Sequence, residues 1–102
     1  LAELGPGRGT LMADALRAVA GVPGLSGALS VHLVEASPTL RAEQARRLPE
    51  ATWHARVEDL PEGPLLLLAN EFLDALPIRQ FVRAPGGWAE RVVGLRDGAL
   101  AW

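Results

Sequence analysis

Short apolar runs alternate with segments of helical spacing along the first two thirds of the chain, and this alternation predicts an α/β fold. Residues 10–20 place leucine, alanine and valine on one helix face, and Thr10 stands in the position of an N-cap. A second helix is predicted over residues 38–48, because Ser37 can cap its start and Pro38 suits its first turn. Strands are predicted in residues 1–4, 30–35, 52–57 and 65–69.

The same pattern predicts which residues face the core. The second helix is expected to turn Leu40, Ala45 and Leu48 inward, and to turn its charged side chains outward, namely Arg41, Glu43, Arg46 and Arg47. Residues 65–69 are apolar at every position, which is typical of a central parallel strand covered on both faces. Since crossover connections between parallel strands are right-handed, helices are expected on both faces of the sheet.

The character of the chain changes after Pro77. Residues 79–83 and 88–95 flank a Pro-Gly-Gly turn and predict a β-hairpin, and Asp97-Gly98 predicts a second tight turn. The expected organisation is an α/β cofactor-binding core over residues 1–77 followed by a β-hairpin or meander over residues 78–102.

Composition narrows the class of protein. The 102 residues suit one domain, and the apolar fraction of 49% with 22% charged residues argues against disorder. A net charge of −2 argues against a nucleic-acid partner, and the longest apolar run is too short to span a membrane. Every basic residue is Arg, which together with abundant Ala, Gly, Leu and Pro indicates a GC-rich, bacterial coding sequence. With no membrane span and no secretory signal recognised, a cytoplasmic protein is expected. The chain starts without Met inside a predicted strand, so a longer parent protein is expected.

Three alternating glycines, Gly5, Gly7 and Gly9, separate the first predicted strand from the first helix. Glycines allow a sharp turn and close approach of a ligand, and the N–H groups of the following helix favour an anion. The third glycine comes one residue too early for the dinucleotide fingerprint. A G-x-G-x-G loop with Glu3 two residues ahead is instead the pattern of class I methyltransferases. The alternative is a tight turn without a ligand.

Acidic residues follow the second and third predicted strands. Glu35 can accept two hydrogen bonds from a ribose diol, as such residues do in both nicotinamide and S-adenosylmethionine enzymes. Glu58 and Asp59 stand where the loop would border an adenine, with surface charges as the alternative. His32 is expected to be a half-exposed strand residue.

Asn70, Glu71 and Asp74 follow the fourth predicted strand. If residues 71–74 form a helical turn, the i, i+3 spacing puts both carboxylates on one face. They could then hold a cationic acceptor such as a guanidinium and accept the proton lost on methyl transfer. The alternative is that they complement a helix N-terminus.

Four motifs together resemble the MidA-like methyltransferases: ELGPGRGTL at residues 3–11, VEASP at 34–38, NEFLDALP at 70–77 and GWAERVV at 87–93. This family includes a mitochondrial protein arginine methyltransferase that acts in respiratory complex I assembly. The resemblance implies part of a Rossmann-like class I methyltransferase fold, from the end of strand 1 through strand 4, plus a β-meander. It implies that S-adenosyl-L-methionine is the cofactor and that a protein is the acceptor of the methyl group. It does not indicate an oligomeric state.

The resulting hypothesis assigns roles to individual residues. The expected catalytic residues are Glu71 and Asp74. The expected cofactor-binding residues are Glu3, Gly5, Gly7, Gly9, Glu35, Glu58, Asp59 and Asn70, and no metal site is expected. Two alternatives stay open. One is a non-catalytic assembly or scaffold protein that binds the cofactor or no ligand, and the other is an NAD-dependent oxidoreductase.

Overall fold

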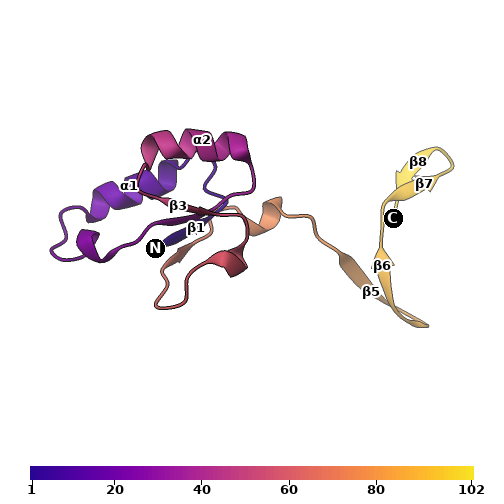
Figure 1. Ribbon diagram of the computed structural model, residues 1–102. Coiled ribbons are helices and arrows are strands. Elements are labelled where there is room, and N and C mark those ends of the chain that lie inside the picture. Colours follow the sequence, from indigo (N-terminus) through magenta and orange to yellow (C-terminus); the bar gives the residue numbers. More distant parts are fainter.

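A computed structural model describes residues 1–102 and has a four-stranded parallel sheet at its centre. The strands lie in the order β3-β2-β1-β4, so the chain reverses direction across the sheet after β3 (Figure 1). Each strand is shorter than the apolar run that predicts it: β1 is Ala2–Leu4, β2 is His32–Val34, β3 is Thr52–His54 and β4 is Leu67–Leu68. The predicted α/β class and the parallel pairing are confirmed.

Both helices cover the same face of the sheet, α1 over Thr10–Val19 and α2 over Pro38–Arg47 (Figure 1). The prediction of helices on both faces is therefore wrong. The reason is that β1, β2 and β3 follow one another in a single direction, and successive right-handed crossovers in one direction place their helices on one side. The connection that reverses direction, between β3 and β4, forms only the 3-10 turn η2 (Val57–Asp59). Neither helix is long and apolar enough to cross a membrane.

The core lies between the helices and the sheet. Met12 of α1, Leu33 of β2 and Leu48 at the end of α2 are buried against one another. The expected inward position of Ala45 is wrong, because Ala45 is exposed and Gln44 is fully buried in its place. Since Gln44 and Leu48 are four residues apart, they share one face of α2.

The leucines around β4 are exposed, against the prediction of a strand covered on both faces. Leu65 and Leu67 are each 46% exposed and Leu66 is 61% exposed. β4 pairs with β1 alone and forms an edge of the sheet. Within residues 1–102, β4 has one neighbouring strand and no layer covering its second face. Its apolar side chains are therefore exposed to solvent.

The residues after η3 (Leu73–Ala75) form two antiparallel hairpins that do not pair with the main sheet. The first hairpin joins β5 (Gln80–Ala84) to β6 (Gly87–Arg91), and the second joins β7 (Gly94–Arg96) to β8 (Ala99–Ala101). Asp97 and Gly98 both have positive φ in the second turn, as the sequence predicts. The hairpins extend away from the α/β core and give the molecule a longest dimension of 62 Å (Figure 1).

Candidate functional site

The glycine loop runs from the carboxyl end of β1 into α1. Gly9, with φ of 75°, is the N-cap residue, and Thr10 is the first residue of the helix, so the predicted N-cap role of Thr10 is wrong. A Cβ atom on Gly9 would lie 3.2 Å from Cδ1 of Leu48 and 3.4 Å from Cγ of Gln44. Glycine is required at this position because the start of α1 passes close to α2 with a backbone conformation that L side chains rarely adopt.

The start of the same loop contacts the segment that follows β4. A Cβ atom on Gly5 would lie only 2.7 Å from Cδ2 of Phe72. The aromatic ring therefore occupies the space that a larger residue at position 5 would need. This contact brings the glycine loop and residues 70–77 together at the carboxyl edge of the sheet, as the sequence predicts for a site shared by both motifs.

Glu3 is buried within β1, with only 3% of its surface exposed. Burial raises the pKa of the Glu3 carboxyl above its ordinary value of 4.5, against the smaller opposing effect of a hydrogen bond from the backbone N–H of Met12. The second carboxylate oxygen, Oε2, is buried without a hydrogen-bond partner. A buried polar atom in this state is costly, and such atoms are often completed by a ligand or an ordered water.

Glu35 follows β2, and its carboxylate is held in place by two donors. The backbone N–H of Ser37 donates to Oε1 at 2.8 Å, and the Gln44 amide nitrogen lies 3.3 Å from Oε2. Ser37 also caps α2 as predicted, since its Oγ accepts from the Leu40 backbone N–H. A carboxylate offers about four lone-pair sites, so two positions stay free for further donors such as ribose hydroxyls.

Helix α2 holds the glycine loop through its side chains. Gln44 donates from Nε2 to the carbonyl oxygen of Gly7 at 2.7 Å. On the exposed side, Arg47 donates to Oγ1 of Thr10 at 2.9 Å, and Arg8 forms an ion pair with Glu43 at 3.6 Å. The buried contact dominates, because exposed ion pairs contribute about 0–1 kcal/mol.

Two polar residues of α2 shape this edge although the sequence pattern did not predict them. Gln44 could have been found from the spacing of Leu40, Gln44 and Leu48, which fall four residues apart on one face. Arg41 was expected to point outward, but it is half-buried and donates to the carbonyl oxygens of Glu35 at 2.6 Å and His54 at 3.0 Å. Arg41 thus joins the carboxyl ends of β2 and β3, and no pattern in the sequence shows this.

Glu58 and Asp59 lie in the exposed turn after β3 and interact mainly with Arg56. The Asp59 carboxylate accepts from the backbone N–H of Arg56 at 3.1 Å and closes the turn. The Glu58 carboxylate lies 3.3 Å from Nε of Arg56. A backbone hydrogen bond, and then Arg56, lower the pKa of Glu58. Both acidic residues are thus already engaged in local contacts.

Asn70, Glu71 and Asp74 are exposed beyond the end of β4. The helical turn starts only at Leu73, and Glu71 precedes it with φ of 46°. The premise that both carboxylates share one helical face is therefore wrong. Their alternative role is seen in part, since η3 has no side-chain cap but carries Asp74 in its first turn, where a carboxylate complements the N-terminus. A non-glycine residue with positive φ is uncommon and is often found at functional positions.

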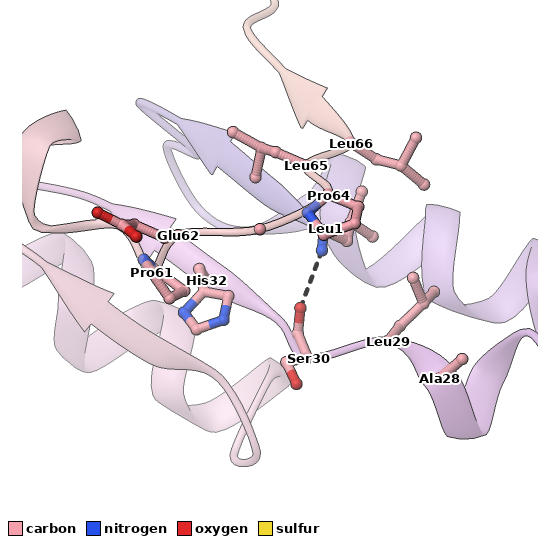
Figure 2. Close-up of a pocket in the computed structure, with 11 residues that line it drawn as sticks. Leu1, Ala28, Leu29, Ser30, His32, Pro61, Glu62, Pro64, Leu65 and Leu66 are labelled. Atoms are coloured by element: carbon pink, nitrogen blue, oxygen red, sulfur yellow. Dashed lines mark hydrogen bonds between the residues drawn. The ribbon is translucent and has the colours of Figure 1, made fainter.

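The largest cavity, about 500 Å³, lies at the opposite edge of the sheet, near the amino ends of the strands. Figure 2 shows its lining, which includes Leu1, whose amino nitrogen donates to the carbonyl oxygen of Ser30. His32 also lines it, is half-buried as predicted, and lies with Nδ1 3.0 Å from Nε2 of His54. Burial, and then the charge of His54, lower the pKa of His32. None of the predicted site residues lines this cavity.

Comparison with known proteins supports the interpretation of the motifs. A family model described as "Putative S-adenosyl-L-methionine-dependent methyltransferase" matches residues 1–102. The mitochondrial protein arginine methyltransferase NDUFAF7 of Danio rerio is 38% identical over 93% of this chain and 28% of its own length. The homologous protein of Drosophila melanogaster is 38% identical over 97% of this chain and 28% of its own length.

A solved structure shows the same fold with a bound ligand. It is a "likely methyl transferase" from Burkholderia thailandensis bound to S-adenosyl-homocysteine, and it matches with a TM-score of 0.68 and 30% identity. The match covers 98% of this chain and 27% of that chain. The predicted partial Rossmann-like class I methyltransferase fold is confirmed. The chain spans about 28% of the length of the curated relatives it matches. The chain belongs to the MidA-like family of S-adenosyl-L-methionine-dependent methyltransferases.

Proposed function

We propose that this chain supplies the cofactor-binding part of an S-adenosyl-L-methionine-dependent methyltransferase. The observation that carries the proposal is the joining of the Gly7 carbonyl and the Glu35 carboxylate through Gln44 at the carboxyl edge of the sheet. The loop after β1 stands where strand order reverses, since β2 and β4 lie on either side of β1. Ligands of open α/β sheets bind at such switch points.

The chemistry of the residues fits the cofactor. Glu35 keeps acceptor positions for the two ribose hydroxyls, and a Cβ atom on Gly7 would meet nothing within 4 Å, so the loop backbone is open to a ligand there. The unpaired oxygen of Glu3 suits the ammonium group of the methionine part. Asn70 and the exposed pair Glu58 and Asp59 complete the proposed binding set, although the pair is engaged with its own turn.

Glu71 and Asp74 are the proposed catalytic residues. The cofactor, when bound, supplies a methyl group bonded to a sulfonium sulfur. That sulfur is a good leaving group because it departs as a neutral thioether. In our proposal the two carboxylates attract a cationic acceptor, and one of them accepts the proton that the acceptor nitrogen loses. The printed names of the relatives are those of protein arginine methyltransferases, so a guanidinium of a protein is the proposed acceptor. The proposed link to respiratory complex I assembly rests on the resemblance of the motifs to the MidA-like family.

One observation favours a second candidate function, that of a non-catalytic assembly protein. The hairpins expose aromatic side chains stacked with arginines, with Arg83 5.5 Å from the ring centre of Trp88 and Arg91 5.4 Å from that of Trp102. Such residues are enriched at protein interfaces.

The family and the S-adenosyl-homocysteine in the solved relative favour S-adenosylmethionine over NAD.

We also propose that the parent protein is bacterial and cytoplasmic, whereas the curated relatives are mitochondrial. No nucleic-acid or membrane partner is part of the proposal. The division into a core over residues 1–77 and a meander over residues 78–102 is proposed as a boundary between cofactor binding and the contact surface.

Calorimetric titration of the complete protein with S-adenosylhomocysteine tests the proposal, with NAD as the control ligand. We expect saturable binding of S-adenosylhomocysteine alone. Glu35→Ala should weaken this binding about tenfold, since it removes an acceptor of charge-assisted hydrogen bonds. Glu62→Ala removes an exposed carboxylate at the opposite edge and is the matched control. It should bind S-adenosylhomocysteine as tightly as the unsubstituted protein does.

Absence of binding by the folded parent protein would refute the cofactor proposal and favour the assembly function. Equal binding by Glu35→Ala and the parent would refute the ribose assignment alone. Binding of S-adenosylhomocysteine without methyl transfer to arginine-containing proteins of a cell extract would favour the assembly function. The proposed cofactor site would be unaffected by that result.

A further inference from the structure

Gln44 is the one fully buried polar side chain outside the strands, and both its amide nitrogen and its amide oxygen are hydrogen-bonded. Its amide nitrogen donates to the Gly7 carbonyl oxygen at 2.7 Å and toward Oε2 of Glu35 at 3.3 Å. Its amide oxygen accepts from the indole nitrogen of Trp53 at 2.8 Å. One side chain thus connects the glycine loop, the end of β2 and strand β3.

The three partners require an amide at this position. Two of them are acceptors and one is a donor, which matches the two N–H groups and the carbonyl of glutamine. A glutamate would direct a second carboxylate toward Glu35 and the Gly7 carbonyl, and a methionine of similar length would leave all three partners without their bonds. Because the Gln44 side chain is fully buried and its three partners are half-buried, water replaces these bonds only in part.

We propose that Gln44 is a positioning residue for cofactor binding. It fixes the orientation of the Glu35 carboxylate for the ribose hydroxyls and the position of that carboxylate relative to the glycine loop. The indole of Trp53 in turn fixes which end of the Gln44 amide faces the site. This inference rests on the proposed function, since it assigns a role toward the same cofactor.

Glu35 is restrained on both sides of its carboxylate. The Ser37 backbone N–H holds Oε1 from the start of α2, and the Gln44 side chain holds Oε2 from the second turn of the same helix. Without Gln44, one restraint is lost and the carboxylate can rotate about its remaining bond to Ser37. The ribose hydroxyls would then meet an acceptor whose direction is no longer set before binding, and affinity falls with that loss of preorganisation.

The test uses Gln44→Met in the complete protein, titrated with S-adenosylhomocysteine and with its 2′,3′-dideoxy analogue. We expect affinity for S-adenosylhomocysteine to fall about tenfold and affinity for the dideoxy analogue to fall much less. Arg46→Met places the same side chain on the exposed face of α2 and is the matched control. Trp53→Phe keeps one aromatic ring but removes the indole N–H that donates to Gln44, so a smaller loss in the same direction is expected.

A double-mutant cycle separates positioning from general stabilisation. If Gln44 acts through Glu35, Gln44→Met should change the affinity for S-adenosylhomocysteine little in a Glu35→Ala background. Equal losses for both ligands, equal losses in both backgrounds, or no loss at all would each overturn the inference. If Gln44→Met does not fold, the same cycle with Trp53→Phe and Glu35→Ala tests whether Gln44 acts through Glu35.

The outcome also distinguishes the inference from the function on which it rests. No binding of S-adenosylhomocysteine by the unmodified protein would refute the proposed function, and the inference with it. Normal binding by the parent together with an insensitive Gln44→Met variant would refute the inference alone.

Discussion

The contact between the glycine loop and Phe72 makes a sharp prediction about Gly5. Gly5 and Gly7 both have positive φ, of 59° and 54°, which L side chains rarely adopt. A Cβ atom on Gly5 would lie 2.7 Å from the Phe72 ring, whereas one on Gly7 would meet no atom within 4 Å. Substituting alanine at each position therefore imposes the same backbone strain but only one steric overlap.

The magnitudes follow from these two terms. Alanine in the left-handed conformation costs about 1–2 kcal/mol, and the less flexible unfolded chain offsets about 0.4–1 kcal/mol of it. Gly7→Ala should therefore lower the free energy of unfolding by about 0–1.5 kcal/mol. Gly5→Ala adds the displacement of an aromatic ring, about 1–3 kcal/mol on the scale of overpacked cores.

Urea denaturation of the complete protein, followed by tryptophan fluorescence, measures both variants. Gly5→Ala should lose about 1–3 kcal/mol more than Gly7→Ala. Adding Phe72→Ala to each should remove that difference, because the overlap disappears with the ring. Equal destabilisation by the two glycine substitutions would refute the contact between the loop and residues 70–77.

Two further predictions concern acidic residues. Glu3 has a raised pKa in the folded protein, so the folded state binds the proton more tightly, and stability should fall as the pH rises above the unfolded value of about 4.5. Glu3→Gln should remove this dependence in denaturation curves measured from pH 4 to 7 while weakening S-adenosylhomocysteine binding, and an unchanged pH dependence would contradict the assignment. Asp74→Ala should leave S-adenosylhomocysteine affinity within about twofold and lower methyl transfer to an arginine-containing protein about 10²-fold or more. Loss of affinity and turnover together would instead place Asp74 in the cofactor site.

The structure also explains why the second helix matters beyond its packing. Its inward face supplies Leu48 to the core and Gln44 to the loop, and Arg41 joins the ends of β2 and β3. A single ten-residue helix therefore positions the two strand ends that carry the proposed ribose site.

The sequence by itself determined the order of elements and led to the proposed position of the site. Apolar runs between helical segments predict the parallel α/β arrangement, and the glycine loop with Glu35 predicts binding at the carboxyl edge, because these signals depend on residues close together in the chain. The turn at Asp97 and Gly98 was predicted for the same reason.

Only the tertiary structure decided which side chains meet. The two helices share one face because of the strand order, the leucines of β4 are exposed because β4 is an edge strand, and Glu71 lies outside the helical turn that contains Asp74. The hydrogen bond from Gln44 to the Gly7 carbonyl joins residues 37 positions apart in the chain. No local pattern encodes such a contact, because it depends on the crossover connections that place α2 beside the glycine loop at the start of α1.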